Sequence, residues 1–240
     1  MNIVKSRINI FKTIKPTIPK LRTMSTKKPS ELAKITKIVD LESKDAKWVK
    51  LQKIHYTNPN GEARDWEMTA RTTRIPGQEI DGVGIIALVK DPSNPTDSPK
   101  IVLQKQFRPP VEAVCIEFPA GLLDPNETAL ECAIRELHEE TGYVVTKDQH
   151  LGNSEIMFND AGFTNTNLIS VMLEVDLSTK ENQNPIPQLE ENEFIETFLV
   201  NLAELPEELE KLSEKGYKVD SKVASIAAGL KLSRAFNLGK

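Results

Sequence analysis

The sequence predicts an α/β fold in which a mixed sheet lies between helices, with a small antiparallel sheet added near the N-terminus. Three observations support this prediction. Short apolar segments of strand length lie on both sides of one amphipathic helix with clear caps. Two further helices close the chain, and a dense turn signal separates two candidate strands that precede everything else. The 240 residues suffice for one large domain or two small ones.

The strands are expected in a simple order along the chain. Residues 47–56 and 64–73 form an antiparallel hairpin around the Asn-Pro-Asn-Gly turn at 58–61. Residues 178–192 are polar and contain prolines, so we expect them to be irregular. The remaining expected strands are rich in Val, Ile, Leu and Phe and lie at residues 82–89, 100–107, 114–118, 168–177 and 193–202.

The central helix has well-defined ends in the sequence. Thr128 and Glu131 predict a capping box at its start, and Gly142 is typical of a helix C-terminus. The last helix is expected to begin near residue 220. The apolar residues of the central helix recur at helical spacing and are expected to face the core; they are Leu130, Ala133, Ile134 and Leu137.

The N-terminal segment differs in composition from the rest. Residues 1–28 contain eight Lys and Arg residues and no acid. This is typical of a mitochondrial presequence, and the alternative is a basic flexible tail, with Met24 as a second candidate start. We therefore predict a tail at 1–30, an N-terminal hairpin domain at 31–78 and a main domain at 79–240. The expected location is the cytoplasm, with mitochondrial targeting through residues 1–28 as the alternative.

The overall charge excludes some partners. A net charge of −4 and a pI near 5.6 give no global basic field, so neither nucleic acid nor a membrane is an expected partner. No apolar run reaches the ~18–20 residues of a membrane span. Cys115 and Cys132 are the two cysteines and have no metal-site spacing, which favours a reducing compartment. We expect Cys132 to be a core residue rather than a nucleophile, and the three histidines to be structural or exposed.

A dense motif covers the central helix and the segment before it. Its spacing is G-x5-E-x7-R-E-U-x-E-E-x-G-U, where U is bulky and apolar. By this motif the sequence is identified as a member of the Nudix hydrolases, which implies an α/β/α sandwich and metal-dependent hydrolysis of nucleoside diphosphate derivatives. The matching residues are Gly121, Glu127, Arg135, Glu136, Leu137, Glu139, Glu140, Gly142 and Tyr143.

The motif also makes physical sense without the family. Glu136 and Glu140 lie one turn apart on one helix face, where like charges repel. A bridging cation would reverse the sign of that interaction, and carboxylate oxygens favour Mg²⁺, with Mn²⁺ as the alternative. Arg135 is expected to pair with Glu139 and to orient Glu127. A merely solvated acidic face is the alternative, but it does not explain the fixed glycines.

The segment before the helix is expected to contribute to the site. Residues 117–122 leave a strand, and we expect a sharp turn that Gly121 permits. In Nudix enzymes the backbone carbonyl just before this glycine completes the metal shell. The resemblance therefore implies that Ala120 is a metal ligand together with Glu136, Glu140 and Glu193.

Outside the motif, residues 45 to about 235 resemble the ADP-ribose pyrophosphatases (ADP-sugar diphosphatases) of this family. In these enzymes two tryptophans sandwich the adenine ring, and such stacking contributes ~1–3 kcal/mol per base. Arginines hold the diphosphate or the terminal ribose. The alternatives are core tryptophans and solvated surface arginines. The resemblance assigns substrate binding to Trp48, Trp66, Glu67, Arg71, Arg108, Leu122 and Asp160. The 159–163 loop that contains Asp160 departs from the family pattern.

Two of these residues raise a geometric question. In a regular strand Trp66 and Arg71 would face opposite sides. Either a bulge intervenes, or the two residues serve different copies of the site. The second option fits the resemblance, because these enzymes are homodimers that exchange the N-terminal hairpin and build each site from both subunits.

The expected reaction is hydrolysis of ADP-ribose to AMP and ribose 5-phosphate with two or three Mg²⁺ ions. Its expected catalytic residues are Glu136, Glu139, Glu140 and Glu193, the last as metal ligand or general base. Glu191, or a solvated acidic loop, is the alternative for Glu193. Another ADP-sugar or nucleoside diphosphate derivative is the alternative substrate. A non-catalytic nucleotide-binding Nudix module is the alternative of another class, but no motif glutamate is missing.

Overall fold

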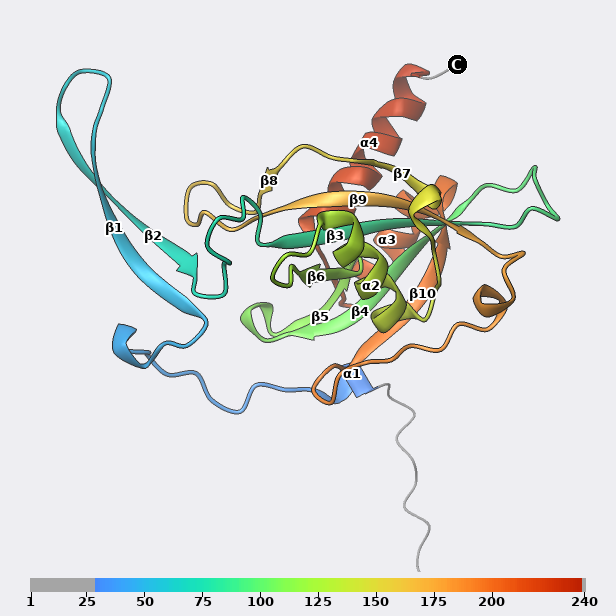
Figure 1. Ribbon diagram of the computed structural model, residues 1–240, viewed down its shortest axis with the longest axis horizontal. Coiled ribbons are helices and arrows are strands. Elements are labelled where there is room, and N and C mark those ends of the chain that lie inside the picture. The colour runs from blue at the N-terminus through green and yellow to red at the C-terminus, as the bar shows by residue number, and fades with distance from the viewer. Residues whose placement is uncertain (1–28, 239–240) are drawn as a thin grey trace, which may run out of the picture.

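A computed structural model describes residues 29–238 and separates them into a two-stranded sheet and a nine-stranded mixed sheet with helices on both faces (Figure 1). The tail and presequence predicted for residues 1–28 lie outside the described residues. Pro29 and Ser30, which the sequence assigns to the tail, belong instead to the short helix α1 (Pro29–Leu32), and Ser30 is buried.

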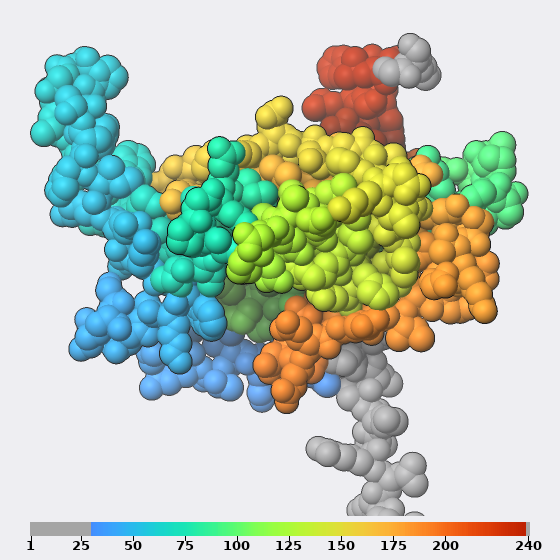
Figure 2. All heavy atoms as spheres, in the orientation of Figure 1, coloured from blue at the N-terminus to red at the C-terminus, as the bar shows by residue number. Residues whose placement is uncertain are grey.

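The small sheet is the predicted hairpin. Strands β1 (Val49–Thr57) and β2 (Ala63–Arg71) pair antiparallel in one unbroken register. In the turn, Gly61 has a φ of +79°, which favours glycine, and the Asn58 side chain accepts hydrogen bonds from two backbone N–H groups. Every residue of β1 is exposed, and the hairpin projects from the body of the molecule (Figure 2).

The large sheet runs in the order β11-β5-β4-β3-β9-β7, with β10 beside β4, β6 beside β3 and β8 beside β9. Two pairs, β3–β9 and β5–β11, are parallel and the others are antiparallel, so the sheet is mixed as predicted. Its strands are β3 (Gly82–Lys90), β4 (Lys100–Arg108), β5 (Ala113–Glu117), β6 (Ala120–Leu122), β7 (His150–Asn153), β8 (Met157–Phe158), β9 (Asn167–Asp176), β10 (Ile195–Asn201) and β11 (Lys218–Val219).

Helices cover both faces of this sheet. Alternate residues of β3 point to opposite sides, so Ile85 packs in a core with α2 (Ala129–Thr141), whereas Ile86 packs against α3 (Leu205–Glu214) and α4 (Ser221–Phe236). The predicted α/β/α sandwich is therefore confirmed. Within residues 29–238, no helix is both long enough and apolar enough to cross a membrane.

Helix α2 has the predicted caps. Thr128 and Glu131 form a reciprocal capping box, and Gly142 ends the helix with a φ of +78°. A Cβ on Gly142 would also lie 2.3 Å from the backbone N of Ile186, so the glycine is required for a second reason. Ile186 lies in the 178–192 connection, which is irregular as expected apart from one short 3-10 helix, Lys180–Gln183.

The segment between the two sheets is fixed by one buried ion pair. The Arg74 guanidinium donates to both oxygens of Asp81, at 2.7 and 2.6 Å, and also to the carbonyl of Asn165 and the side chain of Asn167. Burial alone would raise the pKa of the Asp81 carboxyl, but the hydrogen bonds from Arg74 and from the Asn167 backbone outweigh it and lower that pKa. The network fastens the end of the hairpin to β3 and β9.

Replacing Asp81 by Asn is expected to lower the free energy of unfolding by about 2–3 kcal/mol at pH 7, because Arg74 loses its charged partner. The folded-state pKa of Asp81 is lowered, so its contribution is present above its ordinary pKa of about 4 and is lost as the pH falls through the folded value. Urea unfolding of both proteins between pH 7 and pH 2 measures this, with exposed Asp97→Asn as control. A difference that stays constant over this range would contradict the prediction.

Candidate functional site

Helix α2 brings two carboxylates to the centre of the site. The Oε2 atom of Glu140 accepts hydrogen bonds from Gln104 Nε2 at 3.0 Å and from the Ala120 backbone N–H at 3.1 Å. Burial raises the pKa of Glu140 to about 8, these two hydrogen bonds oppose the rise, and the charges of Glu136 and Glu193 add to it. Burial also raises the pKa of Glu136. Ionisation of both Glu136 and Glu140 in this site therefore costs free energy.

Gly121 of the motif leaves space for the carboxylate of Glu136. A Cβ on Gly121 would lie 1.9 Å from both Cδ and Oε1 of Glu136. Gly121 lies in β6 and is not among the residues with positive φ, so our expectation that it permits a sharp turn is wrong. The glycine is needed because the Glu136 carboxylate packs directly against its α-carbon.

Arg135 organises the acidic residues around it. Its Nε and Nη2 donate to the two oxygens of Glu127 at 2.8 and 2.9 Å, as predicted. Its Nη1 donates to Glu136 at 2.8 Å and to Glu139 at 3.2 Å. Hydrogen bonds from Arg135 lower the pKa of the Glu127 carboxyl. One guanidinium thus holds three carboxylates of the motif.

Cys132 lies beneath this cluster. It is fully buried, and its thiol lies 3.4 Å from the carbonyl oxygen of Leu122, to which it donates. Burial raises the pKa of the Cys132 thiol. The prediction that Cys132 is a core residue is confirmed.

Glu193 lies on the loop before β10. Its charge contributes to the raised pKa of both Glu136 and Glu140, and its side chain is half-buried, whereas Glu191 is exposed. Strand β10 begins two residues later than predicted, because residues 190–193 form a turn in which Glu193 Oε2 accepts from the Glu190 backbone N–H at 3.1 Å. The role of Glu193, with Glu191 as the alternative, stays a prediction.

The donor set fits a hard divalent cation. Glu136 and Glu140 are partly or fully buried carboxylates that repel each other and Glu193, and a cation would relieve that repulsion. Within the described chain no three acidic, thiol or imidazole side chains form a closed cluster, and Arg135 holds Glu136 and Glu139 in ion pairs. Arg135 engages one oxygen of each carboxylate, Oε1 of Glu136 and Oε2 of Glu139.

A polar cavity of about 290 Å³ opens beside the carboxylates. It brings together four residues predicted to bind substrate or metal, namely Arg71, Arg108, Ala120 and Leu122. It also includes Gly121 of the motif and six residues to which we had assigned no role: Asp81, Gly82, Val83, Asn159, Asn167 and Leu168. Asn159 lines this cavity, whereas the adjacent residue Asp160, which was predicted to bind substrate, does not.

The Arg108 side chain forms an ion pair with Glu117. Its Nε donates to both oxygens of Glu117, at 2.8 and 3.0 Å. These hydrogen bonds raise the pKa of Arg108 further. Its Nη2 also donates to Oε2 of Glu117 at 2.5 Å, and this bidentate pair orients the guanidinium. The Arg108 side chain is 45% exposed, so its role in binding substrate stays a prediction.

Glu67 and Asp160 lie outside this cavity in the single chain. Glu67 is exposed on β2 opposite Lys53. Asp160 is exposed, and its side chain accepts a hydrogen bond from the Gly162 backbone N–H at 3.2 Å. Their predicted contacts with substrate therefore remain predictions.

The two tryptophans are surface residues. Trp48 is 71% exposed and Trp66 is 49% exposed, which excludes the alternative that both belong to a core. The unbroken register also excludes a bulge between Trp66 and Arg71. Trp66 pairs with Ile54, six ladder positions from Trp48, which is about 20 Å. One adenine ring cannot contact both tryptophans of the same chain.

Comparison with known proteins identifies the family. A family model for the NUDIX domain matches residues 81–221. The chain belongs to the Nudix family. It is 49% identical to the "ADP-ribose pyrophosphatase" of Saccharomyces cerevisiae, over 90% of this chain and 92% of that protein. It is 34% identical to the "ADP-sugar pyrophosphatase" of Mus musculus, over 78% of this chain and 83% of that protein.

The fold has a counterpart among solved structures. The protein titled "Crystal structure of ADP compounds hydrolase" matches with a TM-score of 0.52 and 19% identity, over 80% of this chain and 87% of that one. At this level of identity the match supports the Nudix fold.

Sequence reasoning missed the residues that support the Nudix motif from other strands. Gln104 follows three buried apolar residues of β4, and a polar residue inside such a run is a signal for a functional contact. Glu117 begins the segment before the helix, but its partner Arg108 lies on another strand. The register of β4 with β5, in which Gln104 pairs with Glu117, brings the side chains of Arg108 and Glu117 together.

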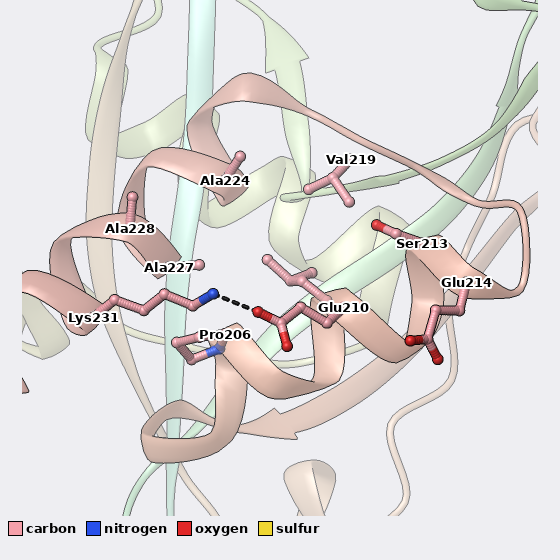
Figure 3. Close-up of a pocket in the computed structure, with 10 residues that line it drawn as sticks. Pro206, Glu210, Ser213, Glu214, Val219, Ala224, Ala227, Ala228 and Lys231 are labelled. Carbon is pink, nitrogen blue, oxygen red and sulfur yellow. Dashed lines mark hydrogen bonds and ion pairs between the residues drawn. The ribbon is translucent and has the colours of Figure 1, made fainter.

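A second cavity, of about 550 Å³, lies between α3 and α4, away from the Nudix motif (Figure 3). Apolar and small side chains such as Leu209, Val219 and Ala227 contribute much of its lining, and its lysine, Lys231, is paired with Glu210. This cavity offers no group of convergent carboxylates and is not the candidate active site of the Nudix domain.

Replacing Gly121 by Ala is expected to displace the Glu136 carboxylate and to weaken divalent metal binding by about 10- to 100-fold. The clash involves the end of a flexible side chain, so the melting temperature should change little. Electron paramagnetic resonance with Mn²⁺ measures the affinity. Gly229→Ala, where nothing lies within 4 Å of the added Cβ, is the control. Unchanged Mn²⁺ affinity would show that Glu136 is not a ligand.

Proposed function

We propose that this protein hydrolyses ADP-ribose to AMP and ribose 5-phosphate with Mg²⁺, or alternatively Mn²⁺, as cofactor. The observation that carries the proposal is the convergence of Arg71 and Arg108 on one polar cavity beside the carboxylates of α2. Two guanidinium groups suit the four charged or polar oxygens of a diphosphate. The names of the yeast and mouse relatives support an ADP-linked sugar as the group that carries this diphosphate.

In this proposal different residues bind the substrate and the metal. Arg71 and Arg108 bind the diphosphate or the terminal ribose, and Glu117 holds Arg108. The Ala120 carbonyl and the carboxylates of Glu136 and Glu140 would hold the metal, and Glu193 would be a further ligand if it were not the general base. A bound divalent ion neutralises charge on the diphosphate and lowers the pKa of water.

The chemical step needs no covalent intermediate. The oxygen of a water molecule attacks one phosphorus, the phosphoric anhydride bond breaks, and the leaving phosphate takes the bridging oxygen. A Glu193 carboxylate oxygen accepts the proton that the water loses, and the electrostatic effect of Glu193 on both Glu136 and Glu140 supports this role. Glu139 is ion-paired with Arg135 and acts by holding that arginine.

A homodimer supplies the adenine site in this proposal. The nine exposed residues of β1 and the exposed tryptophans leave the hairpin without a core of its own, and an isolated two-stranded hairpin is marginal in water. Because Trp48 and Trp66 of one chain lie about 20 Å apart, a sandwich needs tryptophans from two copies. Each site then combines residues of both subunits.

Product analysis over a panel of ADP-sugars in ¹⁸O-labelled water tests the reaction. We expect AMP and ribose 5-phosphate from ADP-ribose, with the label in whichever product carries the attacked phosphorus. Glu140→Gln should form no product, because it removes a ligand, yet should fold normally, since an amide oxygen still accepts from Gln104 and Ala120. Faster hydrolysis of another ADP-sugar would reassign the substrate. Binding without turnover would identify a nucleotide-binding module.

Mixed dimers test the shared site. Trp48→Ala and Trp66→Ala should each raise KM by roughly 5- to 150-fold, because each removes one stacking partner. In a mixture of the two variants, half of the sites in the heterodimer regain both tryptophans if these come from different subunits. The control mixes tagged and untagged Trp48→Ala. Absence of low-KM activity in the heterodimer would show that both tryptophans come from one chain.

A further inference from the structure

The last turn of α2 is fastened to the segment that carries Glu193. A helix leaves its final carbonyl groups without partners inside the helix. Here the Glu139 carbonyl accepts from the Gln188 backbone N–H at 2.7 Å, and the Glu140 carbonyl accepts from Thr197 Oγ1 at 3.3 Å. Gln188 precedes Glu193 and Thr197 follows it, so Glu193 lies between two attachments to the catalytic helix.

Gln188 contacts helix α2 through both its backbone and its side chain. Besides its backbone bond, its side-chain Nε2 lies 2.9 Å from His138 Nε2, on the same turn of α2. Two residues earlier, the backbone of Ile186 comes so close to Gly142 that no side chain fits there. The upstream arm of the loop therefore follows the surface of the helix end.

The downstream attachment belongs to the sheet. Strand β10 begins at Ile195, which pairs with Gln106 of β4, and Thr197 lies within this strand. Between the attachments, the Glu193 backbone N–H donates to the Glu190 carbonyl at 3.0 Å and closes a turn. The sheet fixes β10, which follows the turn. The position of the turn therefore depends on where Gln188 fixes the segment that precedes it.

We propose that Gln188 is a positioning residue that sets the place of the Glu193 carboxylate relative to Glu136 and Glu140. This rests on the proposed function, in which Glu193 accepts the proton of water. Gln188 is exposed and does not line the substrate cavity, so it acts through Glu193 rather than on the substrate. Its side-chain amide, not only its backbone, ties the loop to the helix through His138.

The first test is Gln188→Ala, which removes the contact with His138. We expect kcat for ADP-ribose to fall about 10- to 100-fold, because a small displacement of a catalytic group is costly. KM should stay within about twofold, since the substrate cavity is unchanged. The melting temperature should also be unchanged. Gln183→Ala, an exposed glutamine in the same connection, is the matched control and should behave as the wild type.

The second test is a double-mutant cycle with Glu193→Gln. If Gln188 acts through Glu193, then Gln188→Ala should have no further effect on kcat in the Glu193→Gln background. Losses that multiply would overturn the proposal and show that Gln188 acts elsewhere. Full activity of Glu193→Gln would overturn the proposed base and this proposal with it. A large loss in Glu193→Gln with no loss in Gln188→Ala would overturn this proposal alone.

A third measurement does not depend on activity. Hydrogen–deuterium exchange of peptides covering residues 184–195 should be faster in Gln188→Ala than in the wild type, with exchange elsewhere unchanged. Equal exchange in this segment would show that the side chain of Gln188 does not fix the loop.

Discussion

The repulsion between Glu136 and Glu140 is the constraint on which the structure around the motif depends. Two carboxylates placed one turn apart and taken out of water destabilise the folded state, and fixed donors offset the cost. Those donors come from different elements: Gln104 from β4, the Ala120 backbone from β6 and Arg135 from α2 itself. The helix and sheet must therefore pack in one fixed arrangement before the site exists, and a divalent cation bound there would relieve the remaining repulsion.

Local signals explain why the catalytic helix could be predicted in detail. The capping residues, the apolar spacing and the pairing of Arg135 with Glu127 all follow from short separations along the chain. The role of Gly121 was interpreted wrongly because its reason is not local: the Glu136 carboxylate packs against it across the interface of β6 and α2. A glycine in a sequence shows that a side chain is absent, but not which neighbour requires that absence.

Contacts between distant segments set the limit of prediction. Strands of two to four residues, such as β8 and β11, are too short for periodicity to reveal. The partnership of Arg108 with Glu117 needs the pairing of β4 with β5. The exposure of both tryptophans excludes a shared core position, and their stacking role stays a prediction; only the register of the hairpin shows how far apart they lie.

The burial of Cys132 has a consequence for the chemistry that the site tolerates. Oxidants and alkylating reagents attack the thiolate form of cysteine, and burial raises the pKa of the Cys132 thiol, which disfavours that form. Its sulfur is also shielded by the backbone of Leu122. The helix that carries Glu136 and Glu140, the proposed metal ligands, thus also carries a thiol with no exposed surface. Reagents that modify thiols therefore have no direct access to Cys132 in the folded protein.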